Sequence, residues 1–419
     1  MTELGEIPHE WEVNNGFIKI KSGFGFKLRE YELEGLPLIR INNVMYGEII
    51  NEDLCYLPCS YLNNYKEFVL KKGDVLLALN RPITNNKLKI GKITEGPSIL
   101  YQRVGKLEMD GNRYHSDFYF HYMQSESFIN RLNNSLVGTD QPYIKTSEFE
   151  NLKFVVPTLE EQEKIASILS TVDEQINNVE ALIKKNKELK KGLMQTLLTK
   201  GIGHTKFKKT EIGEIPEGWS IKTINDVVNL IKSGLSRSLK DEDIGIPCIR
   251  SNNMNNYKFD KSDLKYWFLE DNKGANINEY ILRDGDILVN FINSLAQIGK
   301  TCLYEDIGRP VIYTTNIFRM NLNEQIILNK YFYYISQTER YNNEIKLITK
   351  PAVNQASFTV ADFKSIKISI PPINEQMGIV SILSEVDKKI EEHENKKQKL
   401  EEIKKGLMQQ LLTGKIRVL

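Results

Sequence analysis

The chain has 419 residues, of which 41% are hydrophobic, and its formal net charge is +1. No segment approaches the ~20 consecutive apolar residues of a membrane span, and the N-terminal residues do not form a signal peptide. We therefore expect a cytoplasmic protein without membrane contact, and the overall charge neither favours nor excludes a nucleic-acid partner. The cysteines lack the spacing of a zinc site, so we expect reduced thiols and no bound metal at Cys55, Cys59, Cys248 and Cys302.

The sequence is internally duplicated. Gly-Glu-Ile-Pro followed by Trp occurs at 5–11 and again at 213–219, and Lys-Gly-Leu-Met-Gln-x-Leu-Leu-Thr occurs at 191–199 and again at 405–413. The copies are 208 and 214 residues apart, far beyond the period of about 20–50 residues that is typical of solenoid repeats. The duplication predicts two homologous domains in one chain, and hence a target with two related halves.

Each half begins with a globular part of mixed character. Strand-like runs such as 74–79 alternate with turn residues, and short helices are expected near 116–132. The same pattern returns in the second half, for example at 246–250. The sequence predicts an α+β fold with mostly antiparallel sheets, in domains that span residues 1–157 and 213–371.

A long helix follows each globular part. Its apolar residues recur at alternating spacings of three and four, which is the seam of a coiled coil. We predict one helix over 158–199, a Gly- and Lys-rich linker over 200–212, and a second helix with a C-terminal tail over 372–419. The predicted seam consists of Ile165, Leu169, Val172, Ile176, Val179 and Ile183 in the first helix and Ile379, Leu383, Val386, Ile390, Leu400 and Leu407 in the second.

The two helices are expected to pair with each other. Halves related by a pseudo-twofold axis would make the pair antiparallel, and the charges agree, because acidic residues open the first helix while Lys404 and Lys405 lie near the end of the second. The alternative is that each helix binds a different chain. His393 and Lys397 interrupt the apolar seam of the second helix, and the sequence leaves open whether they face the first helix or a partner subunit.

Three motifs, each present in both halves, carry a resemblance to a known family. They are the Gly-Glu-Ile-Pro…Trp starts, the segment Val-Pro-Thr-Leu-Glu-Glu-Gln at 156–162 with its counterpart Pro-Pro-Ile-Asn-Glu-Gln at 371–376, and the Lys-Gly-Leu-Met-Gln-x-Leu-Leu-Thr helix ends. In this order they resemble the DNA-specificity (S) subunit of type I restriction–modification systems. The resemblance implies two target-recognition domains separated by an antiparallel coiled-coil spacer.

The resemblance also implies a function. Such a subunit is not an enzyme; it reads a bipartite sequence in double-stranded DNA with one domain per half-site. It docks adenine-methyltransferase subunits, of which we expect two, and through them the restriction/translocase subunits. S-adenosylmethionine, ATP and Mg would bind these partners rather than this chain. A rigid helical spacer of ~57 Å also lets two readers meet the major groove on one side of a duplex, about one turn of ~34 Å apart.

Polar or cationic residues at corresponding positions of the two halves are the candidate DNA contacts. Arginine can hold guanine and asparagine can hold adenine through paired hydrogen bonds, whereas lysine contacts phosphates. An Asx turn explains the Asn-Asn pairs at 42–43 and 252–253 equally well. A hairpin turn explains the Gly-Lys pairs at 91–92 and 299–300 about as well. The candidates are Arg40, Asn42, Asn43, Arg81, Lys92, Gln141, Tyr143 and Lys145 in the first half and Arg250, Asn252, Asn253, Asn290, Asn293, Lys300, Lys350, Asn354 and Gln355 in the second.

Two other functions remain alternatives. A coiled-coil scaffold that binds only proteins would share the long helices but would show no preference for a DNA sequence. A self-contained DNA methyltransferase would carry an Asp/Asn-Pro-Pro-Tyr motif, whereas Asp140-Gln-Pro-Tyr143 has Gln at its second position and no counterpart in the second half. A nuclease is disfavoured because the sequence contains no Walker loop and its histidines are scattered.

Overall fold

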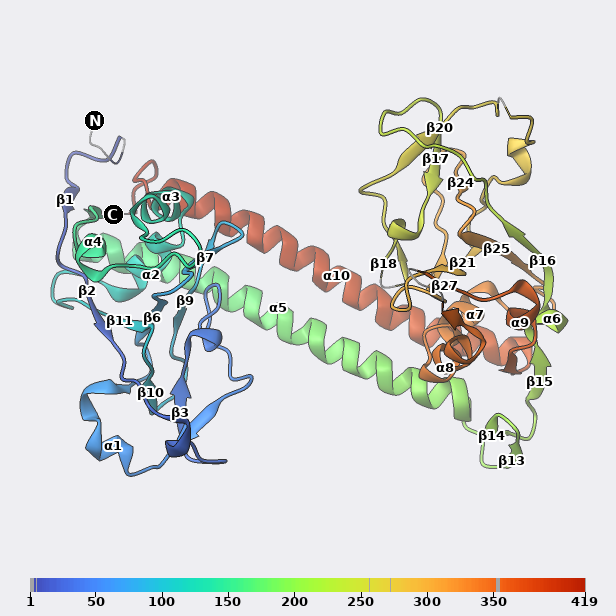
Figure 1. Cartoon of the computed structure of the whole chain (residues 1–419), viewed down its shortest axis with the longest axis horizontal. Helices are drawn as coiled ribbons and strands as arrows, with labels where there is room; N and C mark the ends of the chain where they lie inside the picture. Colours follow the sequence, from blue (N-terminus) through green and yellow to red (C-terminus); the bar gives the residue numbers. More distant parts are fainter. Residues whose placement is uncertain (1–3, 5, 256, 272, 352–354, 419) are drawn as a thin grey trace. The chain divides into compact units, whose positions relative to one another are not determined.

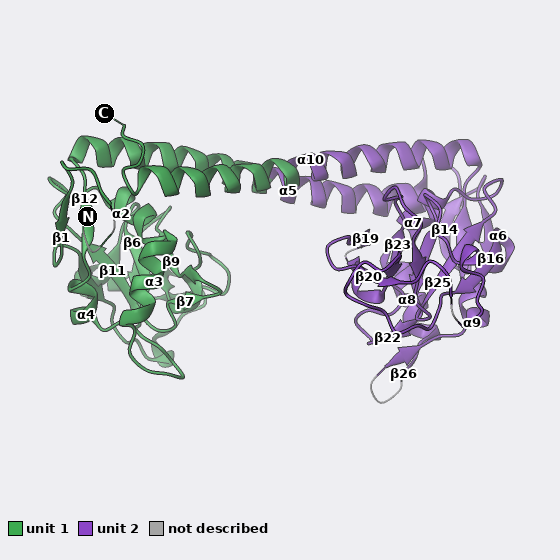
Figure 2. Cartoon of the chain, turned by 90° about the horizontal axis from the view of Figure 1, so that it is seen from above, with its two compact units in different colours: residues 1–181, 394–419 green, residues 182–393 purple. Residues whose placement is uncertain are grey.

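A computed structural model describes residue 4 and residues 6–255, 257–271, 273–351 and 355–418. The chain divides into two compact units, which are coloured separately in Figure 2. Unit 1 contains the described residues up to Ala181 and those from Glu394 onwards, and unit 2 contains those from Leu182 to His393. Each unit therefore combines one globular domain with one end of each long helix. No helix in the described ranges is long and apolar enough to cross a membrane.

The domain of unit 1 is built from short strands and short helices (Figure 1). In chain order they are β1 (Glu12–Asn14), β2 (Lys19–Ser22), β3 (Leu36–Ile39), β4 (Cys55–Leu57), α1 (Tyr61–Asn64), β5 (Val69–Leu70), β6 (Val75–Ala78), β7 (Ile83–Thr84), β8 (Lys87–Leu88), β9 (Ile90–Lys92), β10 (Ser98–Leu100), β11 (Val104–Glu108), α2 (Ser116–Met123), α3 (Glu126–Ser135), α4 (Thr146–Glu150) and β12 (Phe154–Val156). One sheet has the order β2-β11-β6-β9 and is antiparallel. A second has the order β4-β3-β10-β5, in which β3 and β10 run parallel.

The domain of unit 2 repeats this topology. Its elements are β13 (Phe207–Thr210), β14 (Gly213–Pro216), β15 (Ser220–Thr223), α6 (Ile224–Val227), β16 (Val228–Ser233), β17 (Ile246–Ile249), β18 (Met254–Asn255), β19 (Lys258–Phe259), β20 (Lys265–Trp267), β21 (Ile287–Asn290), β22 (Ile292–Asn293), β23 (Thr301–Leu303), β24 (Ile312–Tyr313), β25 (Ile317–Leu322), α7 (Asn329–Ile335), α8 (Glu339–Ile348), β26 (Lys350–Pro351), β27 (Ala356–Ser357), α9 (Val360–Lys364) and β28 (Lys367–Ile370). The sheet β16-β25-β21-β23 corresponds to β2-β11-β6-β9, and β20-β17-β24 corresponds to β4-β3-β10 with its parallel pair. The predicted α+β fold with mostly antiparallel sheets is therefore confirmed in both units.

The two long helices are α5 (Leu159–Lys200) and α10 (Ile373–Leu411), and their ends pair antiparallel within each unit. In unit 1, Asp173 of α5 lies 2.6 Å from Lys404 of α10, and Glu180 lies 2.5 Å from Lys397. In unit 2, Lys190 of α5 pairs with Asp387 of α10 at 2.7 Å. The predicted antiparallel coiled coil is present, and Lys397 faces the first helix.

Most of the predicted seam is buried, as the three–four spacing requires. Near the outer ends of the helices the seam also packs on the domains: Ile165 and Leu169 belong to the core of unit 1, and Ile379 and Leu383 to that of unit 2. Val172, Ile183 and Leu407 are half-buried. The buried positions are Ile165, Leu169, Ile176, Val179, Ile379, Leu383, Val386, Ile390 and Leu400.

A buried glutamine fixes the start of each long helix to its domain. The Nε2 of Gln162 donates to the carbonyls of Pro157 (2.9 Å) and Arg113 (3.2 Å), and its Oε1 accepts from the N–H of His115 (2.8 Å). Thr158 caps the same helix, with its Oγ1 accepting from the N–H of Glu161. The bonds of Gln162 to Arg113 and His115 place the first turn of α5 on the domain of unit 1.

Unit 2 uses the same device. Gln376 Nε2 donates to the carbonyls of Pro371 (2.9 Å) and Ile326 (2.8 Å), and its Oε1 accepts from the N–H of Leu328 (2.9 Å). Neither Gln162 nor Gln376 is exposed to solvent. The Glu-Gln motif that both halves share therefore has a structural role, and we call these two residues the anchor glutamines.

The glutamate before each anchor glutamine joins the two shared motifs. Trp11 Nε1 donates to Glu161 at 2.9 Å, and Trp219 Nε1 donates to Glu375 at 3.0 Å. Each carboxylate also meets a basic side chain from the segment after a long helix: Arg417 contacts Glu161 at 2.6 Å, and His204 contacts Glu375 at 2.8 Å. In each unit, one carboxylate thus connects the start of the domain, the start of one long helix and the segment after the other long helix.

Two regions differ from, or add to, the expectations. Part of the expected linker 200–212 is the strand β13, which pairs with β14. Lys208 of this strand also donates to the carbonyls of Glu217 and Trp219, and these bonds fix the hairpin to the domain.

The four cysteines are free, and burial raises the pKa of Cys248 and Cys302 to about 12. These two thiols therefore serve as packing groups.

We expect Gln162→Ala to lower the free energy of unfolding by about 2–4 kcal/mol, because it leaves one buried N–H and two carbonyls without their partner. Gln175→Ala, an exposed glutamine on the same helix, should change it by less than about 0.5 kcal/mol. Urea unfolding followed by circular dichroism measures both. Equal losses would contradict an anchoring role for the buried amide.

Candidate nucleic-acid interface

The two Arg-x-Asn-Asn segments form equivalent turns at the ends of β3 and β17. In unit 1, Asn43 Oδ1 accepts from the N–H of Arg40 at 3.0 Å, and its Nδ2 donates to the carbonyls of Ile50 and Glu52. In unit 2, Asn253 Oδ1 accepts from the N–H of Arg250 at 3.0 Å. Asn43 and Asn253 are each only 1% exposed. Both amides therefore have a structural role, because the turn uses every polar atom of each amide.

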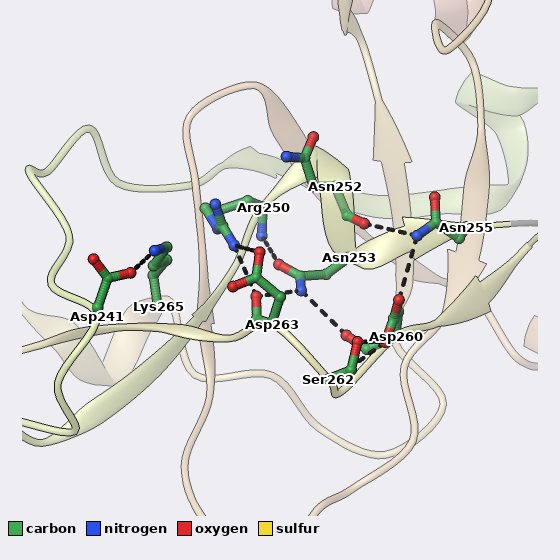
Figure 3. Close-up of polar contacts among 9 residues, drawn as sticks. All are labelled: Asp241, Arg250, Asn252, Asn253, Asn255, Asp260, Ser262, Asp263 and Lys265. Carbon is green, nitrogen blue, oxygen red and sulfur yellow. Dashed lines mark hydrogen bonds and ion pairs between the residues drawn. The ribbon is translucent and has the colours of Figure 1, made fainter. Parts of the chain in front are cut away.

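The arginine of each turn is also tied to its own loop. Arg40 Nη2 donates to the carbonyl of Asp53 at 2.8 Å. Arg250 Nη2 donates to both the carbonyl and the carboxylate of Asp263, at 2.7 Å each. Figure 3 shows the Arg250 network of unit 2, with the side chain of Asn252 pointing away from it. The arginines hold the loop in shape, and the exposed Asn42 and Asn252 are the members of these turns that present an amide to solvent.

A pocket of about 360 Å³ opens beside Asn252 in unit 2. Its arginines, Arg237 and Arg250, are both paired with carboxylates, since Arg237 binds Asp271 through Nε (2.7 Å) and Nη2 (2.6 Å). The hydrogen bond from Arg237 holds the pKa of Asp271 well below its usual range. The rest of the lining is uncharged: Leu235 and Ile292 are apolar, and hydroxyls and amides come from Ser236, Ser251, Asn252, Asn293, Thr314, Thr315, Asn316 and Gln355.

The structure brings four predicted residues of the second half to this pocket and places the others elsewhere. Arg250, Asn252, Asn293 and Gln355 line it. Asn290 is buried, with its Nδ2 donating to the carbonyl of Gln297 and its Oδ1 accepting from Ser251, so it supports the pocket from beneath. Lys300 is half-buried, and Lys350 is exposed beside Asp362. Asn354 lies outside the described residues.

In unit 1, three predicted residues lie on two loops that contact each other: Arg81 between β6 and β7, and Gln141 and Tyr143 between α3 and α4. Arg81 donates its N–H to the carbonyl of Pro142 at 2.7 Å, and its Nη2 lies 3.5 Å from the carbonyl of Asp140. Gln141 and Tyr143, on the second of these loops, are exposed. The two predicted lysines are instead paired with carboxylates: Lys92 with Asp117 at 2.7 Å and Lys145 with Glu148 at 3.4 Å.

The comparisons with known proteins agree with the duplicated architecture. The family described as "Type I restriction modification DNA specificity domain" matches residues 8–191 and 216–402. The chain belongs to this family. Its two matched ranges correspond to the two halves of the duplication.

Relatives support the same assignment, and a solved structure shares the fold. The chain is 42% identical to the MjaVIII specificity subunit of Methanocaldococcus jannaschii over 47% of this chain and 48% of that protein, so it spans about half the length of this relative. It is 26% identical to the EcoKI specificity subunit of Escherichia coli over 82% of this chain and 74% of that protein. The fold resembles the crystal structure of an S subunit from M. genitalium, with a TM-score of 0.62 and 16% identity over 98% of each chain.

Eight residues of the pocket were not predicted from the sequence: Leu235, Ser236, Arg237, Ser251, Ile292, Thr314, Thr315 and Asn316. A usable signal was the polar Thr-Thr-Asn run between the buried strands β24 and β25. Such a run at the end of a strand presents hydroxyls and amides at a sheet edge. Across the described ranges no group of three or more His, Cys, Asp or Glu residues could hold a metal ion.

We expect Asn253→Ala to lower the free energy of unfolding by about 1–3 kcal/mol, because the substitution leaves the N–H of Arg250 and the carbonyls of Asp260 and Asp263 without their partner. Asn252→Ala, one residue earlier and exposed, should change it by less than about 0.5 kcal/mol. Thermal unfolding of the two variants makes the comparison. A large loss in Asn252→Ala would contradict its assignment as a surface amide.

Proposed function

We propose that this chain is the DNA-specificity subunit of a type I restriction–modification complex. It would perform no catalysis, and would read a bipartite target in double-stranded DNA with recognition domains at residues 1–157 and 213–371. The observation that carries the proposal is the duplication itself. Two domains of the same sheet order, each anchored to an antiparallel helix pair, suit a target with two half-sites.

The partners follow from the same proposal. The chain would work in the cytoplasm, where it would dock adenine-methyltransferase subunits and, through them, restriction subunits. Because the two units repeat one topology, we propose two methyltransferase subunits. S-adenosylmethionine, ATP and Mg would be bound by those partners.

In unit 2, we assign base reading to the amide and hydroxyl lining of the pocket. Asn252, Asn293 and Gln355 are within the pocket lining and carry amides, which can form paired hydrogen bonds with adenine. We assign Arg250 to support of the reading loop, since its Nη2 donates to the carbonyl and the carboxylate of Asp263. In unit 1, the corresponding candidate is the pair of contacting loops that hold Arg81 and, on the other loop, Gln141 and Tyr143.

The experiment is to map methylated adenines by single-molecule sequencing in cells that carry the methyltransferase subunits with and without this chain. We expect a bipartite motif that is methylated only when the chain is present. A protein-binding scaffold without DNA readout would leave the methylation pattern without a motif that depends on the chain.

Asn252→Ala tests the reading residues. We expect it to weaken discrimination at one or two positions of one half-site about tenfold, the value of one paired base contact, and to leave the other half-site unchanged. Asn278→Ala removes another exposed amide of unit 2, outside the pocket, and should change neither half-site. Equal weakening of both half-sites by Asn252→Ala would contradict base reading at this pocket.

A further inference from the structure

Each unit contains a polar cluster where three helices meet. In unit 1, Lys404 of α10 pairs with Asp173 of α5 at 2.6 Å. His121 of α2 reaches the same point: its Nε2 lies 3.1 Å from Ser170 Oγ, and its Nδ1 lies 3.7 Å from Asp173 Oδ2. We call Ser170, Asp173, Lys404 and His121 the unit 1 cluster.

Unit 2 contains the same arrangement. Lys190 of α5 pairs with Asp387 of α10 at 2.7 Å. Tyr334 of α7 donates its hydroxyl to Asp387 at 2.8 Å and lies 3.2 Å from Ser384 Oγ. Figure 2 shows α2 and α7 each lying against the helix pair of its own unit. Ser384, Asp387, Lys190 and Tyr334 form the unit 2 cluster.

The two clusters are copies of one another. Ser384, Asp387 and Lys404 each lie 214 residues after Ser170, Asp173 and Lys190, and Tyr334 lies 213 residues after His121. The lysine comes from α10 in unit 1 and from α5 in unit 2, as antiparallel pairing of duplicated helices requires. Neighbouring exposed positions have diverged, since Glu174 and Gln175 correspond to Lys388 and Lys389. If shared ancestry were the only cause of the likeness, the inward-facing positions would have diverged as the exposed ones have. Their identity therefore indicates a physical constraint on the cluster.

Burial makes these contacts specific. The side chains of Lys404 and Lys190 are only 20% and 17% exposed, and that of His121 is 2% exposed. Burial, together with Lys404, lowers the pKa of His121 to about 3, so at neutral pH the ring is an uncharged hydrogen-bonding group. A slide of one helix along the other would leave a lysine and an aspartate partly buried and unpaired, which is costly. An apolar seam alone tolerates such slides better, and polar groups at a seam are known to fix register.

We propose that Asp173 with Lys404, and Asp387 with Lys190, are positioning residues that fix the helix register and the seat of each recognition domain on the helix pair. They thereby set the number of base pairs that the chain accepts between its half-sites. His121 and Tyr334 link the register to the domain, because each reaches from α2 or α7 to the aspartate of the ion pair or to the serine beside it. This inference rests on the proposed function.

The test uses the full chain assembled with its methyltransferase subunits. Binding is measured on oligonucleotides that carry both half-sites with the cognate gap, or with a gap one base pair shorter or longer. We expect Lys404→Met and Lys190→Met to lower the ratio of cognate to altered-gap binding about five- to tenfold, the loss expected from one partly buried charge pair, while each half-site keeps its sequence preference. The matched controls are Lys405→Met and Lys191→Met, which remove the exposed neighbouring lysines and should leave the ratio unchanged.

Further variants separate positioning from a loss of stability. Lys404→Arg keeps the charge, and the exchange of Asp173→Lys with Lys404→Asp keeps the pair in reverse; both should retain gap discrimination even if Lys404→Met fails to fold. His121→Tyr installs the side chain that the other unit uses and should also retain it. Equal weakening at all gap lengths, or an unchanged ratio, would overturn the inference. A wild-type chain without any sequence preference would instead overturn the proposed function, and the inference with it.

Discussion

The structure depends on a hydrogen-bonding constraint at the start of each long helix. A primary amide that is fully buried must satisfy two donors and an acceptor, and Gln162 and Gln376 do so with main-chain groups of the preceding loop and of the domain. Only one placement of the helix meets all three directions. Apolar packing alone would allow small shifts and rotations, so the amide converts a hydrophobic contact into a defined joint.

The carboxylate beside each amide extends that joint to the rest of the unit. Glu161 and Glu375 receive an indole N–H from the start of the domain and a basic side chain from the segment after a long helix. The basic group is Arg417 in unit 1 and His204 in unit 2, because a carboxylate requires a donor and does not select its residue type. The duplication has therefore kept the geometry of the joint while its chemistry has varied.

The sequence predicted the features that periodicity and repetition encode. A three–four apolar spacing defines one face of a helix, and Ile165, Leu169, Ile379 and Leu383 lie where that rule places them. Repetition also singles out residues that both domains need for their fold. Asn43 and Asn253 correspond to one another because both domains need the same turn, and residues that read different half-sites are expected to differ. The pocket residues Ser236, Asn316 and Gln355 come from loops far apart in the sequence, which only the folded sheet brings together.

The charges around the unit 2 pocket indicate how recognition and affinity would be divided. Both arginines that line it are held by carboxylates, so the pocket offers hydrogen bonds but little net charge. Affinity for DNA rises with the number of phosphates that cations neutralise, and this share of binding weakens as salt is added. Discrimination by neutral amides lacks that salt dependence. A chain with a net charge of +1 would thus contribute mainly the choice of sequence, and most of the electrostatic attraction to DNA would come from the methyltransferase subunits that it is proposed to dock.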